Sequence, residues 1–349
     1  MKILINTPDY RRPSSGGVAS FYYGMIGYWT EVVQYNIVGR RRGVSGTIWM
    51  PWDITKFSLK ILFQRPGCVL LNPSLGKNAM RRDFLFLHIA RLLRTPVVVL
   101  IHGFNLDYAK QVDKKWIRKN LNCASLVMVL ADQFRQILKS WGVVAPVELT
   151  TTKVEDRMIE DFDISTRNGV VKNILFLSRM ERAKGVYETI DTFALLKAKH
   201  QKLTLTMVGD GSELKKLREY VAERDIQGVT FTGALDGAPR LKAYRDANFF
   251  FFFTSYGEGM PTVVLEAMAF GLPVLTRYVG GLCDFFEDGR MGRITESLQP
   301  EEFVRLLEPY LTDKRLTKDT SIYNHQYALQ HFMASKVGKN MERLISNHI

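Results

Sequence analysis

The sequence predicts an α/β protein made of two Rossmann-like domains, and three observations lead to this fold class. The chain has 349 residues, which is more than one hydrophobic core usually supports, so two domains are expected. In each half, short apolar runs typical of buried strands alternate with helical runs, as in parallel sheets covered by helices. A polar and charged segment over residues 151–172 lies between the halves. We therefore expect one domain over residues 1–160 and a second over residues 170–334.

The composition is that of a soluble globular protein, with 46% hydrophobic and 24% charged residues. Cys68, Cys123 and Cys283 lie far apart without a C-x-x-C motif or a histidine cluster, so neither a disulfide framework nor a metal site is expected. This cysteine usage favours a reducing, cytoplasmic setting. The chain starts directly with a strand-like run, so no secretory signal is expected, and its apolar runs are too short for a transmembrane helix.

The positive charge of the chain is concentrated in its first half. Residues 1–150 carry 21 Lys and Arg against 8 Asp and Glu, an excess of 13 that equals the net charge of the whole chain. This asymmetry predicts an anionic partner for the first domain, either a membrane, an acidic acceptor or a nucleic acid. Nucleic acid is the least favoured of these, because the sequence has no RNA- or DNA-binding motif and no aromatic stacking platform among its basic residues.

Apolar and helical runs alternate along the first half. Strands are expected at 2–6, 68–72, 96–102 and 125–130, and helices at 18–29, at 79–94 and in a segment that ends near 141. Gly16 and Gly17 stand between the first strand and its helix, where glycine would let the backbone approach a phosphate or sugar, although a plain turn is the alternative. His102 ends a strand, where its ring could bond a sugar hydroxyl or serve a structural role.

Residues 40–65 combine cations, tryptophans and an amphipathic basic run. This composition is typical of an interfacial membrane anchor, and the alternative is a surface loop followed by an ordinary core-packing helix. A second basic cluster at 114–119 also contains a tryptophan. The candidate membrane-binding or acceptor-binding residues are Arg40, Arg41, Arg42, Trp49, Trp52 and Trp116.

The second half repeats the alternation of strands and helices. Strands are expected at 173–178, at 203–212, which ends in a glycine turn, and at 228–233. Helices are expected at 186–199, 213–224, 240–246 and, after Glu301, in the tail. Arg179 and Lys184 lie on the loop after the first of these strands, just before Gly185. Arg can bind a diphosphate through two parallel hydrogen bonds and Lys as a point charge, although a solvated basic loop is the alternative.

Glycine turns follow the next two strands of the second half. Their backbone groups could contact the edge of a nucleobase without selecting one base. The residues in this vicinity are Gly209, Gly211, Gly233 and Leu235.

The stretch from Phe249 to Gly292 carries the densest pattern. Five consecutive phenylalanines predict a strand buried on both faces, and a glycine turn and a helix over 262–270 follow it. Glu258 lies on the turn at the carboxyl end of the strand, where open α/β sheets bind ligands, and Glu266 lies in the helix. The start of this helix is a candidate anion site formed by Gly259, Met260, Pro261 and Thr262, with backbone N–H donors on Gly259, Met260 and Thr262. Two solvated glutamates beside a core helix are the alternative.

The residues Glu-Gly-Met-Pro-Thr-Val-Val-Leu-Glu-Ala-Met-Ala-x-Gly-x-Pro-Val-Leu, which begin at Glu258, resemble the signature of retaining glycosyltransferases of the GT-B fold, family 4. The similarity continues to Gly280-Gly281 and to the Asp-Gly-x-x-Gly motif that begins at Asp288. The resemblance implies two Rossmann-like domains that face each other across a cleft, with the donor in the second and the acceptor at the first. It also implies that a final helix, at about 335–349, crosses back to the first domain.

The resemblance assigns roles to the candidate residues. It implies that Arg179, Lys184 and the Gly16-Gly17 turn hold the donor diphosphate, that Glu266 binds the ribose, and that Glu258 and His102 act on the donor sugar as catalytic residues. Positive charge from these side chains and from the helix amino terminus would stabilise the leaving nucleoside diphosphate, so no metal and no other cofactor is expected to be required.

The expected function is transfer of a sugar from a nucleotide sugar to a saccharide or lipid-linked acceptor, in the synthesis of a cell-envelope polysaccharide or glycolipid. The expected place is the cytoplasm, in peripheral contact with an anionic membrane at the inner face of the plasma membrane. A GT-B sugar-nucleotide epimerase or sugar phosphorylase is the alternative enzyme. A non-catalytic homologue and a basic nucleic-acid-binding protein are the remaining alternatives.

Overall fold

The computed structural model describes residues 1–11, 16–41 and 43–349, which form two compact units. Unit 1 contains Met1–Glu155, Gly257–Met260 and Ala334–Ile349, and unit 2 contains Asp156–Tyr256 and Pro261–Met333. The chain therefore passes from unit 1 to unit 2 within the polar segment at 151–172. The carboxyl-terminal part of this segment packs within unit 2. Arg167 is buried there and donates hydrogen bonds to the carbonyl oxygens of Phe270 and Tyr244, each at 2.9 Å.

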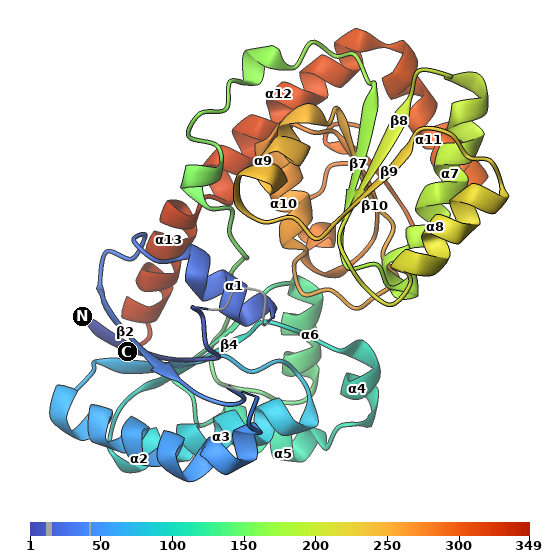
Figure 1. The fold of residues 1–349 in the computed structure, drawn as a ribbon. Helices are drawn as coiled ribbons and strands as arrows, with labels where there is room; N and C mark the ends of the chain where they lie inside the picture. Colours follow the sequence, from blue (N-terminus) through green and yellow to red (C-terminus); the bar gives the residue numbers. More distant parts are fainter. Residues whose placement is uncertain (12–15, 42) are drawn as a thin grey trace. The chain divides into compact units, whose positions relative to one another are not determined.

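The described residues of unit 1 contain a six-stranded sheet in the order β2-β1-β3-β4-β5-β6, with every neighbouring pair parallel (Figure 1). Its strands are β1 (Lys2–Thr7), β2 (Val32–Ile37), β3 (Cys68–Leu71), β4 (Val97–Ile101), β5 (Leu126–Val129) and β6 (Val147–Leu149). The sequence patterns did not predict β2 and β6. β2 is an edge strand whose residues are mostly half-buried, so it lacks the fully apolar run that marks β3 and β4.

Helices cover both faces of this sheet and bury a core on each. One core forms beneath α1 (Gly17–Gly24) and α13 (Ala334–Ser346). The other forms beneath α2 (Gly46–Gln64), α3 (Lys77–Leu92), α4 (Leu106–Gln111), α5 (Lys114–Leu121) and α6 (Asp132–Ser140). Helix α1 is shorter than the predicted 18–29, because the chain turns after Gly24 and reaches a positive φ at Gly27. In α13 the buried Glu342 carboxylate accepts from the amides of Thr30 and Glu31, each at 2.8 Å.

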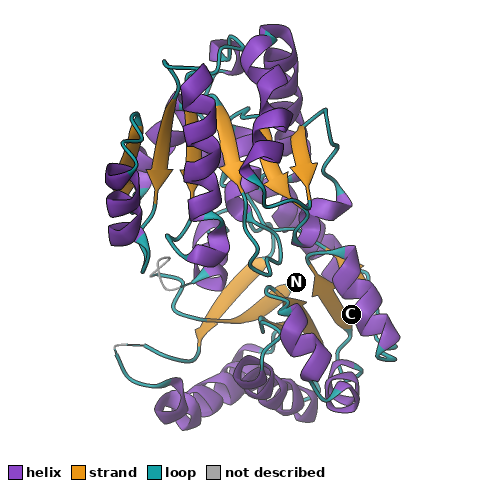
Figure 2. Ribbon diagram, turned by 90° about the vertical axis from the view of Figure 1, so that its right-hand side faces the viewer, coloured by secondary structure: helices purple, strands orange, loops and turns teal. Residues whose placement is uncertain are grey.

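Unit 2 repeats the architecture with the order β12-β11-β10-β7-β8-β9, again with every neighbouring pair parallel (Figure 2). Its strands are β7 (Asn173–Leu177), β8 (Thr204–Val208), β9 (Val229–Gly233), β10 (Phe249–Phe252), β11 (Val274–Arg277) and β12 (Gly292–Thr295). Its helices are α7 (Val186–Lys199), α8 (Leu214–Glu223), α9 (Gly237–Asp246), α10 (Thr262–Ala269), α11 (Pro300–Thr312) and α12 (Lys314–His331). Short 3-10 helices lie at η2 (Asp156–Met158), η3 (Ile164–Thr166), η4 (Arg182–Lys184) and η5 (Gly280–Asp284).

The phenylalanine run forms the buried strand that the sequence predicts. Every residue of β10 is buried, and its side chains alternate between the two faces of the sheet. On one face Phe253, just after the strand, stacks on Phe303 of α11 with ring centroids 3.8 Å apart. On the other face Phe250 lies 6.3 Å from the ring of Tyr244 on α9. The run of five aromatic residues is therefore explained by a parallel sheet with helices on both sides.

Candidate functional site

In each sheet there is one reversal point, a position from which successive strands of the chain are added first on one side and then on the other. In unit 2 this position lies between β7 and β10, and in unit 1 it lies between β1 and β3. Ligands of open α/β sheets bind beyond the carboxyl ends of the strands at such a position, because the loops on either side diverge there. The loops after these four strands contain most of the residues that the sequence singles out.

The loop after β7 carries Arg179 and Lys184. The guanidinium of Arg179 is largely exposed and pairs with the carboxylate of Glu181 at 2.7 Å. Lys184 is buried, and its Nζ lies 4.3 Å from the ring centroid of Tyr256. The amides of Ser255 and Tyr256 donate to the carbonyl oxygen of Ala183 at 2.8 and 3.1 Å, which joins this loop to the loop after β10. The two loops at the reversal point of unit 2 thus form one connected surface that contains Lys184.

Three glycines make this surface compact, because a Cβ atom at any of them would collide with a backbone oxygen. At Gly185 the collision would be with Phe253 at 2.5 Å, and at Gly209 with Ser178 at 1.8 Å. At Gly211 the oxygen of Met180 would lie at 2.5 Å. Gly209 and Gly211 therefore pack on the loop that holds Arg179. Gly233 adopts φ +75° with open space around it, and Leu235 is half-buried.

Glu266 lies on α10 and is almost completely buried. Its Oε2 accepts from Arg240 and, at 2.7 Å, from the hydroxyl of Tyr244, both on α9. The Glu266 carboxylate raises the pKa of Arg240, and burial followed by the same carboxylate raises the pKa of Tyr244. Because both contacts use Oε2, Oε1 is the oxygen that a ribose hydroxyl would approach.

Helix α10 begins at Thr262, where the predicted helix over 262–270 begins, and Pro261 is its N-cap. No side-chain hydrogen bond caps the amino terminus of α10. Because Pro261 has no N–H, the backbone donors that this helix start offers to an anionic ligand begin at Thr262. Pro261 is buried, which fixes where the helix starts.

The residues just before α10, Gly257–Met260, belong to unit 1 by their contacts. A Cβ at Gly259 would lie 2.4 Å from the carbonyl oxygen of His102 and 3.2 Å from Leu130. Met260 packs against the core beneath α1 and α13, and Glu258 keeps partial exposure. The structure therefore brings Glu258 and His102, which lie 156 positions apart in the sequence, onto neighbouring segments of one unit.

His102 follows β4 and belongs to a polar cluster at the reversal point of the first sheet. Its Nε2 lies 3.0 Å from Oδ1 of Asn72, which also accepts from the buried hydroxyl of Tyr22 at 2.5 Å. The imidazole packs edge-on against Phe21 with centroids 5.0 Å apart. Although the residue is not fully buried, these neighbours displace water from the ring and lower the pKa of His102 to about 3. The ring is therefore neutral at physiological pH.

Gly16 and Gly17 open α1, which has no side-chain cap. Both glycines are exposed, and Gly16 adopts φ +141°, with no atom of the described residues within 4 Å of a Cβ built on it. None of the described residues therefore blocks the approach of a ligand to Gly16. The rest of the polar loop before it, residues 12–15, lies outside the described residues.

The candidates for membrane or acceptor contact do not share one environment. Arg41 pairs with the buried Asp53 and covers the ring of Trp49 at 4.2 Å, so Trp49 is half-buried rather than exposed as expected. Trp116 is also half-buried, with its ring 4.9 Å from that of Phe84.

The other two described candidates, Trp52 and Arg40, are exposed. Trp52 exposes 59% of its surface on α2, and Arg40 is exposed just before that helix. Arg42 lies outside the described residues.

Sequence patterns missed three residues of these sites, namely Asn72, Arg240 and Tyr244. Asn72 follows a buried strand directly, at the carboxyl edge where polar side chains signal a ligand. Arg240 and Tyr244 lie four positions apart in α9, a spacing that places both side chains on one face of a helix and that can be recognised in the sequence. Their partner, Glu266, could not be identified from that spacing alone.

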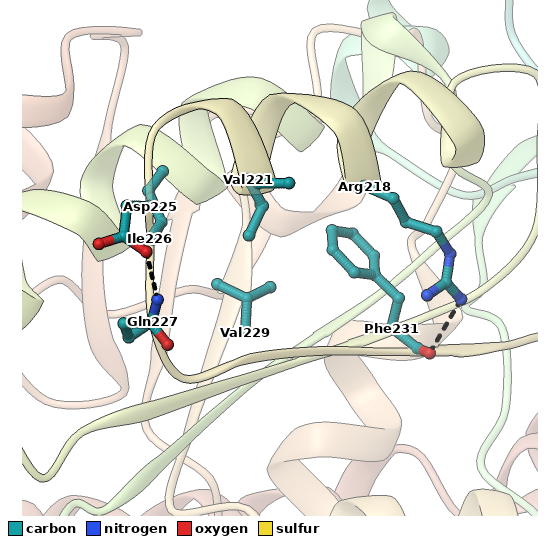
Figure 3. Close-up of a pocket in the computed structure, with 8 residues that line it drawn as sticks. Arg218, Val221, Asp225, Ile226, Gln227, Val229 and Phe231 are labelled. Atoms are coloured by element: carbon teal, nitrogen blue, oxygen red, sulfur yellow. Dashed lines mark hydrogen bonds between the residues drawn. The ribbon is translucent and has the colours of Figure 1, made fainter.

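Two other kinds of site, a metal-ion site and a cavity, were considered for the described residues. No group of three or more His, Cys, Asp and Glu side chains there is placed to hold a metal ion. A cavity of about 260 Å³ lies between α8 and the amino-terminal half of β9, with Arg218, Val229 and Phe231 in its lining (Figure 3). None of the residues singled out above lines this cavity, and it does not lie at a reversal point.

Parts of the chain are similar in sequence to known proteins. Residues 158–327 match the sequence model of the family "Glycosyl transferases group 1". Alpha-monoglucosyldiacylglycerol synthase of Streptococcus pneumoniae (strain ATCC BAA-255 / R6) is 26% identical over 228 residues, which cover 59% of this chain and 52% of that protein. D-inositol 3-phosphate glycosyltransferase of Paenarthrobacter aurescens (strain TC1) is 27% identical over 151 residues, 42% of this chain and 37% of the relative. The chain thus spans about half or less of the length of these relatives.

The fold of the whole chain also has known counterparts. The crystal structure of Anabaena Alr3699/HepE in complex with UDP and glucose superimposes with a TM-score of 0.70 at 16% identity, covering 99% of both chains. The two six-stranded parallel sheets with their covering helices are those of GT-B glycosyltransferases. The chain accordingly has the GT-B fold, and its residues 158–327 match the sequence model of the glycosyl transferases group 1.

Proposed function

We propose that the protein is a retaining glycosyltransferase of family 4. It transfers a sugar from a nucleoside diphosphate donor to a saccharide or lipid-linked acceptor in the synthesis of a cell-envelope polysaccharide or glycolipid. The observation that carries the proposal is the connected surface at the reversal point of unit 2, where Lys184, the open amino terminus of α10 and Glu266 follow neighbouring strands. The match over residues 158–327 and the fold shared with the structure of Anabaena Alr3699/HepE in complex with UDP and glucose support it.

Cations and backbone amides bind the donor diphosphate. Lys184 is held as a point charge, and Arg179 exchanges its exposed pairing with Glu181 for two bonds to phosphate oxygens. The amides at the start of α10 and the Gly16-Gly17 turn add hydrogen-bond donors. Because these groups neutralise the charge that develops on the leaving diphosphate, transfer is expected to proceed without a metal ion. Full activity in the presence of EDTA is the corresponding test.

The sugar and ribose are assigned to the remaining residues. Oε1 of Glu266 accepts from the ribose hydroxyls, while Arg240 and Tyr244 hold Oε2. Glu258 and the neutral ring of His102 bind the hydroxyls of the donor sugar and position its anomeric carbon.

The decisive experiment measures nucleoside diphosphate release from a panel of UDP, GDP and ADP sugars, with NMR of the product to establish the anomeric configuration. Lys184→Met is expected to lower turnover at least 100-fold, because one preorganised charge is worth about 3 kcal/mol in such sites. Lys215→Met on α8 serves as the control, since this lysine is exposed on the helix surface. Unchanged turnover in Glu258→Ala would remove Glu258 from the site. A product that remains a nucleotide sugar, or a sugar phosphate, would favour the epimerase or phosphorylase instead.

We place this activity in the cytoplasm, in peripheral contact with an anionic membrane through the basic first half of the chain. The excess of 13 positive charges in residues 1–150 supports this placement, because anionic lipids attract clustered cations. No helix in the described part of the chain combines the length and the apolar character needed to cross a bilayer.

A further inference from the structure

Helix α2 is apolar on two opposite sides. One side buries Phe57 and Ile61 in the core of unit 1, as expected for a helix that covers a sheet. The opposite side exposes large apolar residues at helical spacing: Ile48, Trp52, Leu59, Leu62 and Phe63. The outward side of such a helix is normally polar, yet Phe63 exposes 81% of its surface here. A contiguous apolar stripe in solvent marks a surface that binds something.

The neighbouring helix extends this surface. Helices α2 and α3 pack side by side beneath the sheet, with the rings of Phe57 and Phe86 4.9 Å apart (Figure 1). On the outward side of α3, Leu85 and Leu92 are exposed, and Leu92 exposes 83% of its surface. The outer face of α2 together with that of α3 is called the outer α2–α3 face below.

The charges on this face have a single sign. Each helix contains one acidic residue, Asp53 on α2 and Asp83 on α3, and both are buried in ion pairs with Arg41 and Arg82. No carboxylate of α2 or α3 is therefore exposed. The cations of these two helices include Lys77, Arg81 and Arg91, which are exposed, and Lys56, which is partly exposed.

We propose that the outer α2–α3 face docks on the surface of an anionic lipid bilayer, with α2 lying in the plane of the interface. The inference rests on the membrane contact in the proposed function and assigns it to a specific surface. Apolar side chains of an interfacial helix enter the boundary between headgroups and acyl chains, and the flanking cations pair with anionic headgroups. Trp52 occupies the depth that tryptophan favours at membranes. A second copy of the chain is a poorer occupant, because this face would set cations against cations.

The test is flotation of the full chain with vesicles of phosphatidylcholine alone and with vesicles that contain phosphatidylglycerol. We expect binding to the anionic vesicles and a blue shift of tryptophan fluorescence that the Trp52→Phe variant lacks. Leu59→Ser with Phe63→Ser should lower binding at least tenfold while the melting temperature stays unchanged, since both side chains face solvent. Lys56→Gln with Arg81→Gln should remove the preference for anionic vesicles. Val144→Ser is the control, because Val144 is an equally exposed apolar residue of unit 1 away from this face.

Equal flotation of wild type and the double serine variant would overturn the assignment, as would the absence of flotation altogether. A wild-type dimer that the double serine variant dissociates, without vesicle binding, would assign the face to a second copy instead. Turnover of a nucleotide sugar is measured on the same preparations. Turnover without vesicle binding would contradict only this inference. Vesicle binding without turnover of any nucleotide sugar would contradict only the proposed function.

Discussion

The Nε2 of His102 donates a hydrogen bond to Oδ1 of Asn72 at 3.0 Å, and the surroundings of Asn72 fix this direction. Nδ2 of Asn72 lies 2.8 Å from the backbone carbonyl oxygen of Asn6, which can only accept, so the amide nitrogen must point there. The oxygen of the same amide therefore faces His102, and Nε2 must carry a hydrogen. Because the ring is neutral, Nδ1 is an acceptor. In the proposed reaction, a hydroxyl of the donor sugar donates to this nitrogen.

Replacing Asn72 with leucine tests this arrangement. The change leaves the imidazole N–H of His102 and the hydroxyl of Tyr22 without an acceptor in a largely buried site. Such losses cost about 1–3 kcal/mol each, so the midpoint of thermal unfolding should fall by several degrees. Turnover should fall as well, because the ring is then free to rotate. Asn78→Leu on the exposed side of α3 is the control and should change neither quantity.

The lowered pKa of His102 predicts a specific pH dependence of stability. The folded-state pKa of about 3 lies below the usual value near 6.5, so between these values the unfolded chain binds more protons than the folded chain. Stability from this group is therefore complete above about pH 6.5 and declines by at most about 1.4 kcal/mol per unit as pH falls towards 3. Partial exposure of the ring makes the decline smaller.

Denaturant unfolding at pH 7.5 and pH 5.0 measures this decline. His102→Gln keeps a donor for Asn72 but does not titrate, so the difference in unfolding free energy between the two pH values should shrink in this variant. An equal pH dependence in both proteins would show that His102 does not supply it.

Glu266 and Arg240 make the second testable pair. Removing the cation in Arg240→Met leaves a buried carboxylate that accepts a hydrogen bond from the hydroxyl of Tyr244, and breaking such an ion pair costs about 3–5 kcal/mol. We expect a lower unfolding midpoint together with weaker binding of nucleoside diphosphates, read by thermal shift. Arg245→Met on the same helix is the matched control, because the Arg245 side chain is exposed. If the folded Arg240→Met protein bound nucleoside diphosphates with unchanged affinity, Glu266 would not be the residue that binds the ribose.

The patterns of the sequence were sufficient for the sheet strands that are buried on both faces. The apolar runs at β4 and β10 stand out because a parallel strand inside the sheet, covered by helices on both faces, is buried at every position. The loops after β7 and β10 were also recognisable as loops, since glycines and charged residues follow each apolar run; that they bind a ligand stays a prediction. The edge strand β2 was not, because half-exposed positions produce no such run.

Side-chain partners were beyond the reach of sequence patterns, because they join residues that only the fold brings together. The burial of Trp49 follows from Arg41 and Asp53, and nothing local signals that arrangement. The contact between Gly259 and His102 is a second example, since it depends on a four-residue segment of the second half packing within unit 1.

Gly259 supplies the last prediction, which concerns the position of Glu258. A methyl group at Gly259 would lie 2.4 Å from the carbonyl oxygen of His102, a backbone atom that cannot move without disturbing β4. Gly259→Ala should therefore displace the segment Gly257–Met260, and a displacement of about 1 Å costs on the order of 100-fold in rate. Gly257→Ala is the matched control, because its added carbon would lie at an ordinary 3.8 Å from Phe104. Turnover of both variants is compared with their melting temperatures. A loss of turnover confined to Gly259→Ala, with little change in melting, would place Glu258 at the reacting sugar, whereas full turnover in Gly259→Ala would exclude that role.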